Sequence, residues 1–118
     1  MSHPAASGLD RTFAALADPA RREVIDLLRQ QPRRASDIAD ALAMSRPAMS
    51  RHLRLLRKAG LVTESEPAHD ARVRVYSLQP EPFSELRGWL EEVEAFWTVQ
   101  LTSFKAHAEG KAKKRGPR

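Results

Sequence analysis

The chain has 118 residues, which suits a single domain. Its hydrophobic share of 42% is enough for a packed core, and the aromatic share of 6% means that aliphatic side chains must fill most of it. The lack of cysteine excludes disulfides, zinc fingers, iron–sulfur clusters and thiol catalysis. No apolar segment approaches the roughly 20 residues of a membrane span, and the N-terminus has no signal-peptide pattern. We therefore expect a soluble, cytoplasmic protein with no membrane partner.

The charge is strongly segregated along the chain. The formal net charge of +5 and the isoelectric point near 10.2 indicate a polyanionic partner. Residues 111–118 carry five basic residues and no acid, and in the rest of the chain basic and acidic residues are equal in number. Within that rest, residues 21–58 hold ten basic residues against four acids, and no acid occurs between Asp40 and Glu64. A basic middle and an acidic end predict one directed binding face.

The N-terminal half is predicted to be helical. Residues 1–8 are small and polar, and we expect them to be disordered. The apolar residues Leu9, Phe13 and Leu16 follow at spacings of four and three, which predicts a short amphipathic helix. Asp18, with proline after it, is typical of the N-cap of a second helix.

Two further helices follow, separated by a tight connection. The third is short and is predicted for residues 37–42, with Ser36 as its N-cap. Ser45 is expected to cap a fourth helix that runs to Ala59. Gly60 then stands where a left-handed C-terminal cap belongs.

The remaining segment predicts a hairpin and a long helix. Residues 61–63 and 72–76 read as two strands joined by a turn, and residues 80–82 begin a final helix of roughly 25 residues. The fold class is therefore mainly α with a small β-hairpin wing, in the order α-α-α-α-β-β-α. The predicted boundaries are a disordered N-terminus (1–8), a winged helix-turn-helix domain that ends in a dimerisation helix (9–108) and a basic disordered tail (109–118).

The fourth helix has one basic face and one apolar face. At about 100° per residue, one side carries Arg46, Pro47, Ser50, Arg51, Arg54, Arg57 and Lys58. A short helix and a tight turn precede it, which is the arrangement that places a second helix in the DNA major groove. A merely solvated arginine face usually carries acids four residues away, and this helix has none. Arginine can pair with guanine edges or phosphates, and serine fits close to bases. In the hairpin, Arg72 and Arg74 are placed to reach DNA as a wing.

The final helix carries an apolar stripe at three- and four-residue steps. Its members are Phe83, Leu86, Leu90, Val93, Trp97, Leu101 and Phe104. The stripe either packs on the chain's own domain or forms a dimer interface. We favour the interface, because a long terminal helix on so small a body leaves apolar surface uncovered.

Three segments resemble the ArsR-type winged helix-turn-helix repressor family over residues 9–80. They are ALADPARR (15–22), SRPAMSRHLRLLRKAGLV (45–62) and RVYSL (74–78). The resemblance implies a homodimeric bacterial transcriptional regulator, usually a repressor, that binds double-stranded DNA. Carried over by position, it implies groove contacts from Ser45, Arg46, Pro47, Ser50 and Arg51. It also implies that the first and last helices together build the dimer interface. The interface residues here would be Leu9, Phe13, Leu16, Phe83, Leu86, Leu90, Val93, Trp97 and Leu101.

The family's metal sites are missing from this sequence. Many members sense metals through a Cys-x-Cys pair entering the third helix, and Arg34 and Ser36 stand at those positions. An Asp-x-His pair on the last helix is also absent. His52 lies on the apolar face of its helix, which favours a packing or hydrogen-bonding role. We therefore expect no metal or other cofactor, as in the metal-independent branch of the family, and the sequence identifies no small-molecule effector. The Phe96–Trp97 region could line a pocket for one or merely pack.

An enzyme is not indicated. Ser50 and His52 are two residues apart and face different directions, so they cannot form a nucleophile–base pair. The five glycines are scattered and form no phosphate-binding loop. Two alternatives to a specific repressor remain, namely a winged-helix protein–protein interaction module and a non-specific nucleic-acid-binding protein driven by its basic tail.

Overall fold

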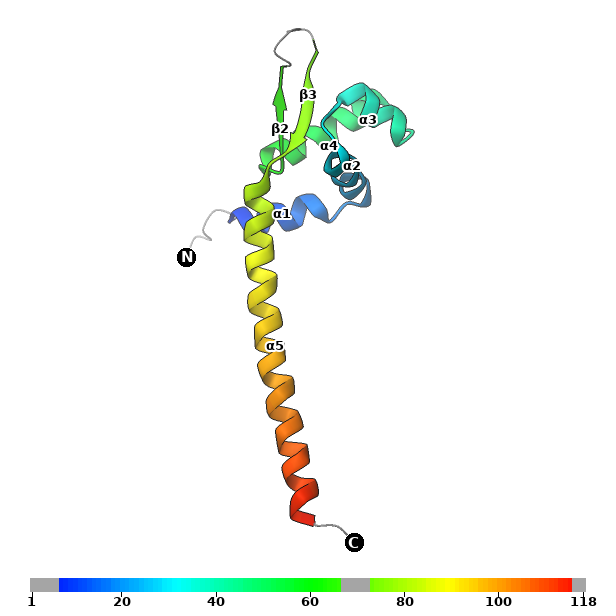
Figure 1. Cartoon of the computed structure of the whole chain (residues 1–118). Coiled ribbons are helices and arrows are strands. Elements are labelled where there is room, and N and C mark those ends of the chain that lie inside the picture. The colour runs from blue at the N-terminus through cyan, green and yellow to red at the C-terminus, as the bar shows by residue number, and fades with distance from the viewer. Residues whose placement is uncertain (1–6, 67–72, 116–118) are drawn as a thin grey trace, which may run out of the picture. The chain divides into compact units, whose positions relative to one another are not determined.

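The computed structural model describes residues 7–66 and 73–115, with side chains up to residue 110. In this part of the chain the elements are α1 (Gly8–Leu16), α2 (Pro19–Gln30), β1 (Arg33–Arg34), α3 (Ala35–Ala41), α4 (Arg46–Lys58), β2 (Val62–Ser65), β3 (Val75–Leu78) and α5 (Pro80–Arg115). The chain divides into two compact units, one up to Leu86 and one from Arg87 onward. The predicted order of helices and hairpin is confirmed (Figure 1).

The sheet has one more strand than the sequence predicted. β3 lies between β1 and β2, and both pairs are antiparallel. The added strand β1 is two residues long and pairs Arg33 with Tyr76 and Arg34 with Val75. Two arginines show no apolar alternation, so nothing in their sequence marks a strand. This strand connects the first half of β3 to the segment between α2 and α3.

Side-chain caps fix where the first two helices begin. The hydroxyl of Ser7 accepts the N–H of Asp10, and the Asp10 carboxylate accepts the N–H of Ser7 in return. Ser7 therefore caps α1 and Gly8 is its first residue, whereas the sequence prediction began the domain at residue 9. Asp18 is confirmed as the N-cap of α2, and its carboxylate accepts the Ala20 N–H at 2.7 Å.

The start of α3 differs from the prediction. α3 begins at Ala35, and its N-cap residue is Arg34, which makes no capping hydrogen bond through its side chain. Ser36 is thus inside the helix and is not its cap. The reason is that β1 ends at Arg34, so the extended backbone of the strand runs directly into the first helical turn.

The turn between α3 and α4 and the end of α4 are sharply defined. Ala43 has a φ of 52°, a left-handed conformation that is uncommon for a residue with a side chain. Ser45 is confirmed as the N-cap of α4, and its Oγ accepts the Ala48 N–H at 3.2 Å. Gly60, with a φ of 79°, provides the predicted left-handed stop.

The core of the first unit lies where α2, α3, α4 and β2 meet. Its largest fully buried apolar side chains are Val24, Ile38, Met49, Leu53, Leu56 and Leu61. Thr12 of α1 is the buried polar residue among those described, and its hydroxyl donates to the Gly8 carbonyl at 3.0 Å. Because three of these core residues come from α4, its apolar face holds the helix firmly and its opposite face stays outward.

Helix α5 is longer than predicted. It begins at Pro80 as expected but continues for 36 residues to Arg115, beyond the expected boundary between domain and tail at residue 108. Between residues 87 and 110 it exposes large apolar side chains, including Trp97 and Phe104. No helix in the described ranges is long and apolar enough to cross a membrane.

Candidate nucleic-acid interface

The outward face of α4 is cationic. Arg46, Arg51 and Arg54 are exposed, while Met49 and Leu53 on the other side of the helix are fully buried. Within the described part of the chain these three arginines make no ion pair, because the carboxylates nearest in sequence lie at Asp40 and Glu64. Their guanidinium groups are therefore available to an external anion.

The N-terminus of α4 adds hydrogen-bond donors to this face. Ser45, Arg46 and Pro47 are all exposed. Ser45 uses its oxygen to cap the helix, which leaves its hydroxyl proton for an external acceptor. The positive end of the helix dipole also favours a phosphate at this position, although Pro47 has no N–H and the N–H groups of Ala48 and Met49 are already paired with Ser45.

An open hollow separates the second half of α4 from the hairpin. It has a volume of about 490 Å³ and is lined by Ser50, Arg54, Arg57, Lys58 and Tyr76. Three cations and two hydroxyl groups thus surround one concave surface. This combination suits a phosphate group, which accepts several charge-assisted hydrogen bonds at once.

Glu64 of β2 connects the hairpin to α4. Its carboxylate is mostly buried, with 15% of the side chain exposed, and it accepts from Nη1 of Arg57 at 2.7 Å. The same carboxylate lies 3.5 Å from Nε of Arg74. In the ladder between β2 and β3, Glu64 stands opposite Tyr76. One carboxylate therefore holds an arginine of α4 and an arginine of the hairpin together.

The surroundings of Tyr76 raise the pKa of its phenol. Burial raises the pKa of its phenol above the usual value of 10.0, and the charge of Glu64 and a hydrogen bond to it raise the pKa further. Arg57 opposes the change by lowering the pKa. The hydroxyl therefore stays protonated throughout the physiological range and can donate a hydrogen bond.

Of the two arginines predicted to contact DNA from the hairpin, the structure describes only Arg74. Arg74 is exposed, but its guanidinium is paired with Glu64 and lies 3.3 Å from Glu66. The exposed pair with Glu66 contributes roughly 0–1 kcal/mol, so a phosphate can displace it, whereas the Glu64 carboxylate is mostly buried. Arg72 lies outside the described residues.

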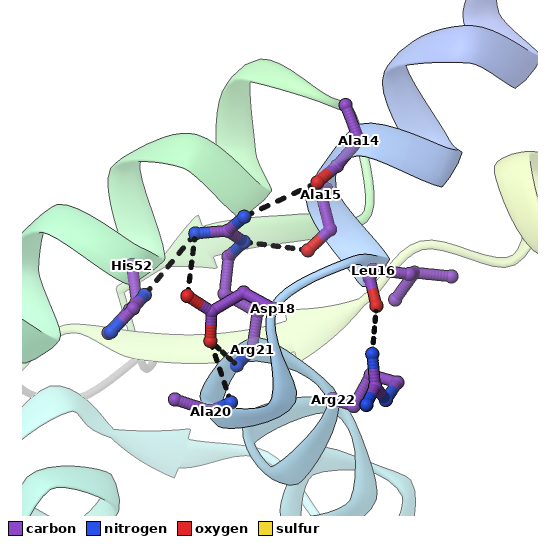
Figure 2. Close-up of polar contacts among 8 residues, drawn as sticks. All are labelled: Ala14, Ala15, Leu16, Asp18, Ala20, Arg21, Arg22 and His52. Atoms are coloured by element: carbon purple, nitrogen blue, oxygen red, sulfur yellow. Dashed lines mark hydrogen bonds and ion pairs between the residues drawn. The ribbon is translucent and has the colours of Figure 1, made fainter.

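A second polar cluster joins α1, α2 and α4. Figure 2 shows Arg21 of α2 at its centre, donating from Nε to the Ala15 carbonyl at 2.6 Å and from Nη2 to the Ala14 carbonyl at 3.3 Å. Its Nη1 lies 3.5 Å from Nδ1 of His52 and 3.6 Å from the Asp18 carboxylate. Since a guanidinium only donates, Nδ1 of His52 is the acceptor. This confirms a hydrogen-bonding role for His52, and it ties the end of α1 to the middle of α4.

The N-cap of α2 belongs to the same cluster. Hydrogen bonds from the backbone, first of all from the Ala20 N–H, lower the pKa of Asp18, and the charge of Arg21 lowers it further. Arg22 donates from Nη1 to the Leu16 carbonyl at 2.6 Å. The two arginines together donate to the last three carbonyls of α1, of which the Ala14 carbonyl also accepts the N–H of Ala17.

The predicted interface residues are unevenly exposed. Phe13, Leu90, Trp97 and Leu101 are exposed, and Leu9, Leu86 and Val93 are half-buried. Leu16 and Phe83 pack partly against the core. The rings of Phe96 and Trp97 meet edge to face with centroids 6.0 Å apart. The stripe on α5 therefore has a large apolar surface that is free in the single chain.

The described residues contain no group of three or more His, Asp and Glu side chains placed to hold a metal ion. At the two positions where many family members carry the Cys-x-Cys pair, Arg34 is ion-paired with Asp37 at 3.2 Å and Ser36 is half-buried in α3.

Sequence reasoning placed Arg57 and Lys58 on the basic face but did not select them as contacts, and it missed Tyr76 and Glu64. The contacts of Glu64 and Tyr76 with the end of α4 depend on how the hairpin packs against that helix. The one sequence feature that could have drawn attention to Glu64 is that it is the first acidic residue after the acid-free segment.

Comparison with known proteins places the chain in a family. The model of the bacterial regulatory proteins of the arsR family matches residues 18–64. The HTH-type transcriptional regulator Rv2034 of Mycobacterium tuberculosis is 39% identical over 95 residues, which are 80% of this chain and 83% of that protein. The chain belongs to the ArsR family. It is therefore a transcriptional regulator built on a DNA-binding winged helix-turn-helix, and not an enzyme.

Other relatives agree with this placement. The transcriptional repressor SdpR of Bacillus subtilis is 36% identical over 56 residues, 48% of this chain and 62% of that protein. Among solved structures, an ArsR-like transcriptional regulator from Rhodococcus sp. RHA1 has a TM-score of 0.73 at 30% identity, covering 87% of this chain and 92% of that one. The homodimeric winged helix-turn-helix DNA-binding domain Mb0332 of Mycobacterium bovis has a TM-score of 0.59 at 27% identity, covering 75% and 79%.

Proposed function

We propose that this ArsR-family protein is a cytoplasmic, homodimeric repressor that binds an imperfectly palindromic operator in double-stranded DNA. The observation that carries the proposal is the exposed trio Arg46, Arg51 and Arg54 of α4, which the described residues leave without ion pairs and which the buried face of the helix holds outward. A bound dimer would exclude RNA polymerase from an overlapping promoter.

The residues divide into base-reading and phosphate-binding groups. Arg46 lies in the first turn of α4, where recognition helices reach base edges, so we assign it direct readout of a base. Ser45, Pro47, Ser50 and Arg51 complete the groove-facing surface. Arg54, with Arg57, Lys58 and Tyr76, surrounds the 490 Å³ hollow and is suited to one backbone phosphate.

The second subunit is expected to dock through α1 and α5. The long apolar stripe of α5 supports this, because exposed apolar surface on so small a protein marks an interface. The homodimeric state of the Mycobacterium bovis relative also supports it. Two copies related by a two-fold axis would present two α4 helices to successive major grooves.

We also propose that DNA binding is independent of metal ions. The chain has no cysteine, and the described residues offer no cluster of histidines and carboxylates. The regulator would then respond to an organic effector or to its own abundance.

A footprint on the DNA upstream of the protein's own gene tests the proposal. We expect a protected, two-fold symmetric site that survives an excess of random duplex at physiological salt, because specific complexes are typically about 10³–10⁷ times tighter than non-specific ones. Chelator or stoichiometric zinc should leave the footprint unchanged. Protection that random duplex removes would instead favour a non-specific nucleic-acid-binding protein.

A further inference from the structure

The first unit contains a second hollow, formed by α1, α2 and α4. Its volume is about 270 Å³, and the residues that line it are Arg11, Ala14, Ala15, Arg21, Leu55, Lys58 and Ala59. At roughly 30 Å³ per water molecule, this is the liquid volume of about nine waters. The hollow is therefore large enough for a small organic molecule.

The floor of this hollow is apolar. Three of its lining residues are alanines, whose short side chains leave the space open. Leu55 is 48% exposed, although it lies on α4 directly before the fully buried Leu56. The structure leaves Leu55 facing this hollow. An apolar ligand body would cover it.

The rim of the hollow is cationic. Arg11, Arg21 and Lys58 contribute to its lining, and none of the lining residues is acidic. The guanidinium of Arg21 is held in place by the Ala14 and Ala15 carbonyls (Figure 2), with the Asp18 carboxylate 3.6 Å away. Lys58 is exposed and has no ion pair within the described ranges, so its ammonium group is the most available of the three.

We propose that this hollow binds a small organic anion, a carboxylate of about six to nine non-hydrogen atoms in all with an apolar body. Lys58 would bind the carboxylate, with the positive charge of Arg21 also on the rim, and Leu55 with the alanines would cover the apolar body. Apolar lining with a few convergent charged groups is the usual composition of small-molecule sites.

The site is physically linked to the DNA-binding face. Lys58 lines this hollow and also the 490 Å³ hollow on the other side, so one ammonium group serves both. An anion bound between α1 and α4 would draw Lys58 away from a phosphate. Arg21 adds a second link, because it joins the end of α1 to His52 of α4. This consequence, a lower affinity for DNA with ligand bound, rests on the proposed function, but ligand binding itself does not.

The test is a titration of the full chain with hexanoate, followed by amide NMR. We expect saturable shifts that cluster at residues 14–15 and 55–59, and binding of 1-hexanol at least about tenfold weaker, since the alcohol lacks the charge that the rim recognises. Lys58→Gln should weaken hexanoate binding several-fold, and Ala14→Leu, which fills the space, should abolish it. The control variants Arg29→Gln, which also replaces a cation by glutamine, and Ala41→Leu, which also enlarges an alanine, lie outside the hollow and should bind hexanoate as the wild type does.

Three results would overturn the site. These are the absence of saturable shifts, equal affinity for hexanoate and 1-hexanol, and unchanged binding by Lys58→Gln in a protein whose dispersed spectrum shows that it is folded. Hexanoate binding that leaves operator affinity unchanged would reject the link to α4. A protein that binds hexanoate but protects no operator would disprove the proposed function and leave the site standing.

Discussion

Among single residues, Arg46 is the one whose replacement should change which DNA sequence the protein prefers. It is exposed in the first turn of α4 and has no ion pair in the described part of the chain. Arg46→Ala should weaken operator binding by roughly 1–3 kcal/mol per half-site and relax the base preference at one symmetric position. Fluorescence anisotropy against a panel of operator point variants measures both effects.

Arg54→Ala is the matched control for this prediction. Arg54 lines the hollow that we assign to a phosphate, so its loss should lower the affinity for all operator variants by a similar factor. If Arg46→Ala behaved in the same way, with uniform weakening and an unchanged base preference, Arg46 would be a phosphate contact and not a reader.

Tyr76 offers a direct test of the junction between hairpin and α4. It is the one tyrosine of the chain, so the ultraviolet absorbance of tyrosinate reports it alone. Burial and Glu64 raise the pKa of its phenol, and an alkaline titration should therefore give a midpoint above 10.0. Glu64→Gln should lower that midpoint, because it removes the neighbouring negative charge.

The sign of the linked stability follows from the raised pKa. The folded state favours the protonated phenol, so the stabilisation is fully present below the pKa of the unfolded chain, near 10. It is lost as the pH rises through the higher pKa of the folded state. Tyr76→Phe should therefore be less sensitive than the wild type to unfolding at alkaline pH. A wild-type midpoint at or below 10 would contradict the described environment of Tyr76.

Residue chemistry that acts locally was predictable from the sequence. Asp18 and Ser45 cap helices, and Gly60 adopts a positive φ, because each property depends on the residue and its immediate neighbours. Ser36 failed as a predicted cap because a strand, invisible in the sequence, supplies the helix start. The ion pair between Arg57 and Glu64 was missed because it requires knowing where β2 lies relative to α4.

Among the elements, long periodic helices were predicted well and the short strand was not. The apolar face of α4 continues through Met49, Leu53 and Leu56 and leaves little ambiguity. β1 is defined only by its pairing with β3, which is a long-range contact. The end of α5 was placed too early because its apolar stripe stops near residue 104, whereas the helix continues through polar residues to Arg115.

The C-terminal basic segment should act as a sequence-independent element. Deleting residues 111–118 removes five cations and no acid. Because each released phosphate contact contributes about 0.9 to the slope of log affinity against log salt, the truncated protein should bind all duplexes more weakly and with a shallower salt dependence. Titrations at several salt concentrations measure this. A changed operator preference after truncation would mean that the segment reads bases.

For the whole molecule, self-association should depend on the apolar stripe of α5. Trp97 and Leu101 are exposed on this stripe, so replacing both by Glu should produce a monomer without unfolding the first unit. Val99 is equally exposed but lies about 200° around the helix from Trp97. Val99→Glu is therefore the matched control and should stay dimeric in sedimentation velocity runs at micromolar concentration. A wild type that sediments as a monomer while binding its operator tightly would contradict the interface.

The arrangement of the whole dimer predicts the form of its DNA site. Two α4 helices related by a two-fold axis should meet successive major grooves on one side of the duplex. The base-reading residues are then repeated with inverted polarity, so the recognised sequence inherits the symmetry of the protein. This is the point at which the fold, the arginine face and the interface on α5 are tested together.

Selection of binding sites from a random duplex library by the purified wild-type protein is the most direct measurement. We expect enrichment of an imperfect palindrome whose half-site centres lie about 10–11 base pairs apart, or a multiple of that spacing. Enrichment of no sequence at physiological salt, or of a single asymmetric half-site, would contradict the account of this protein as a dimeric, sequence-specific repressor.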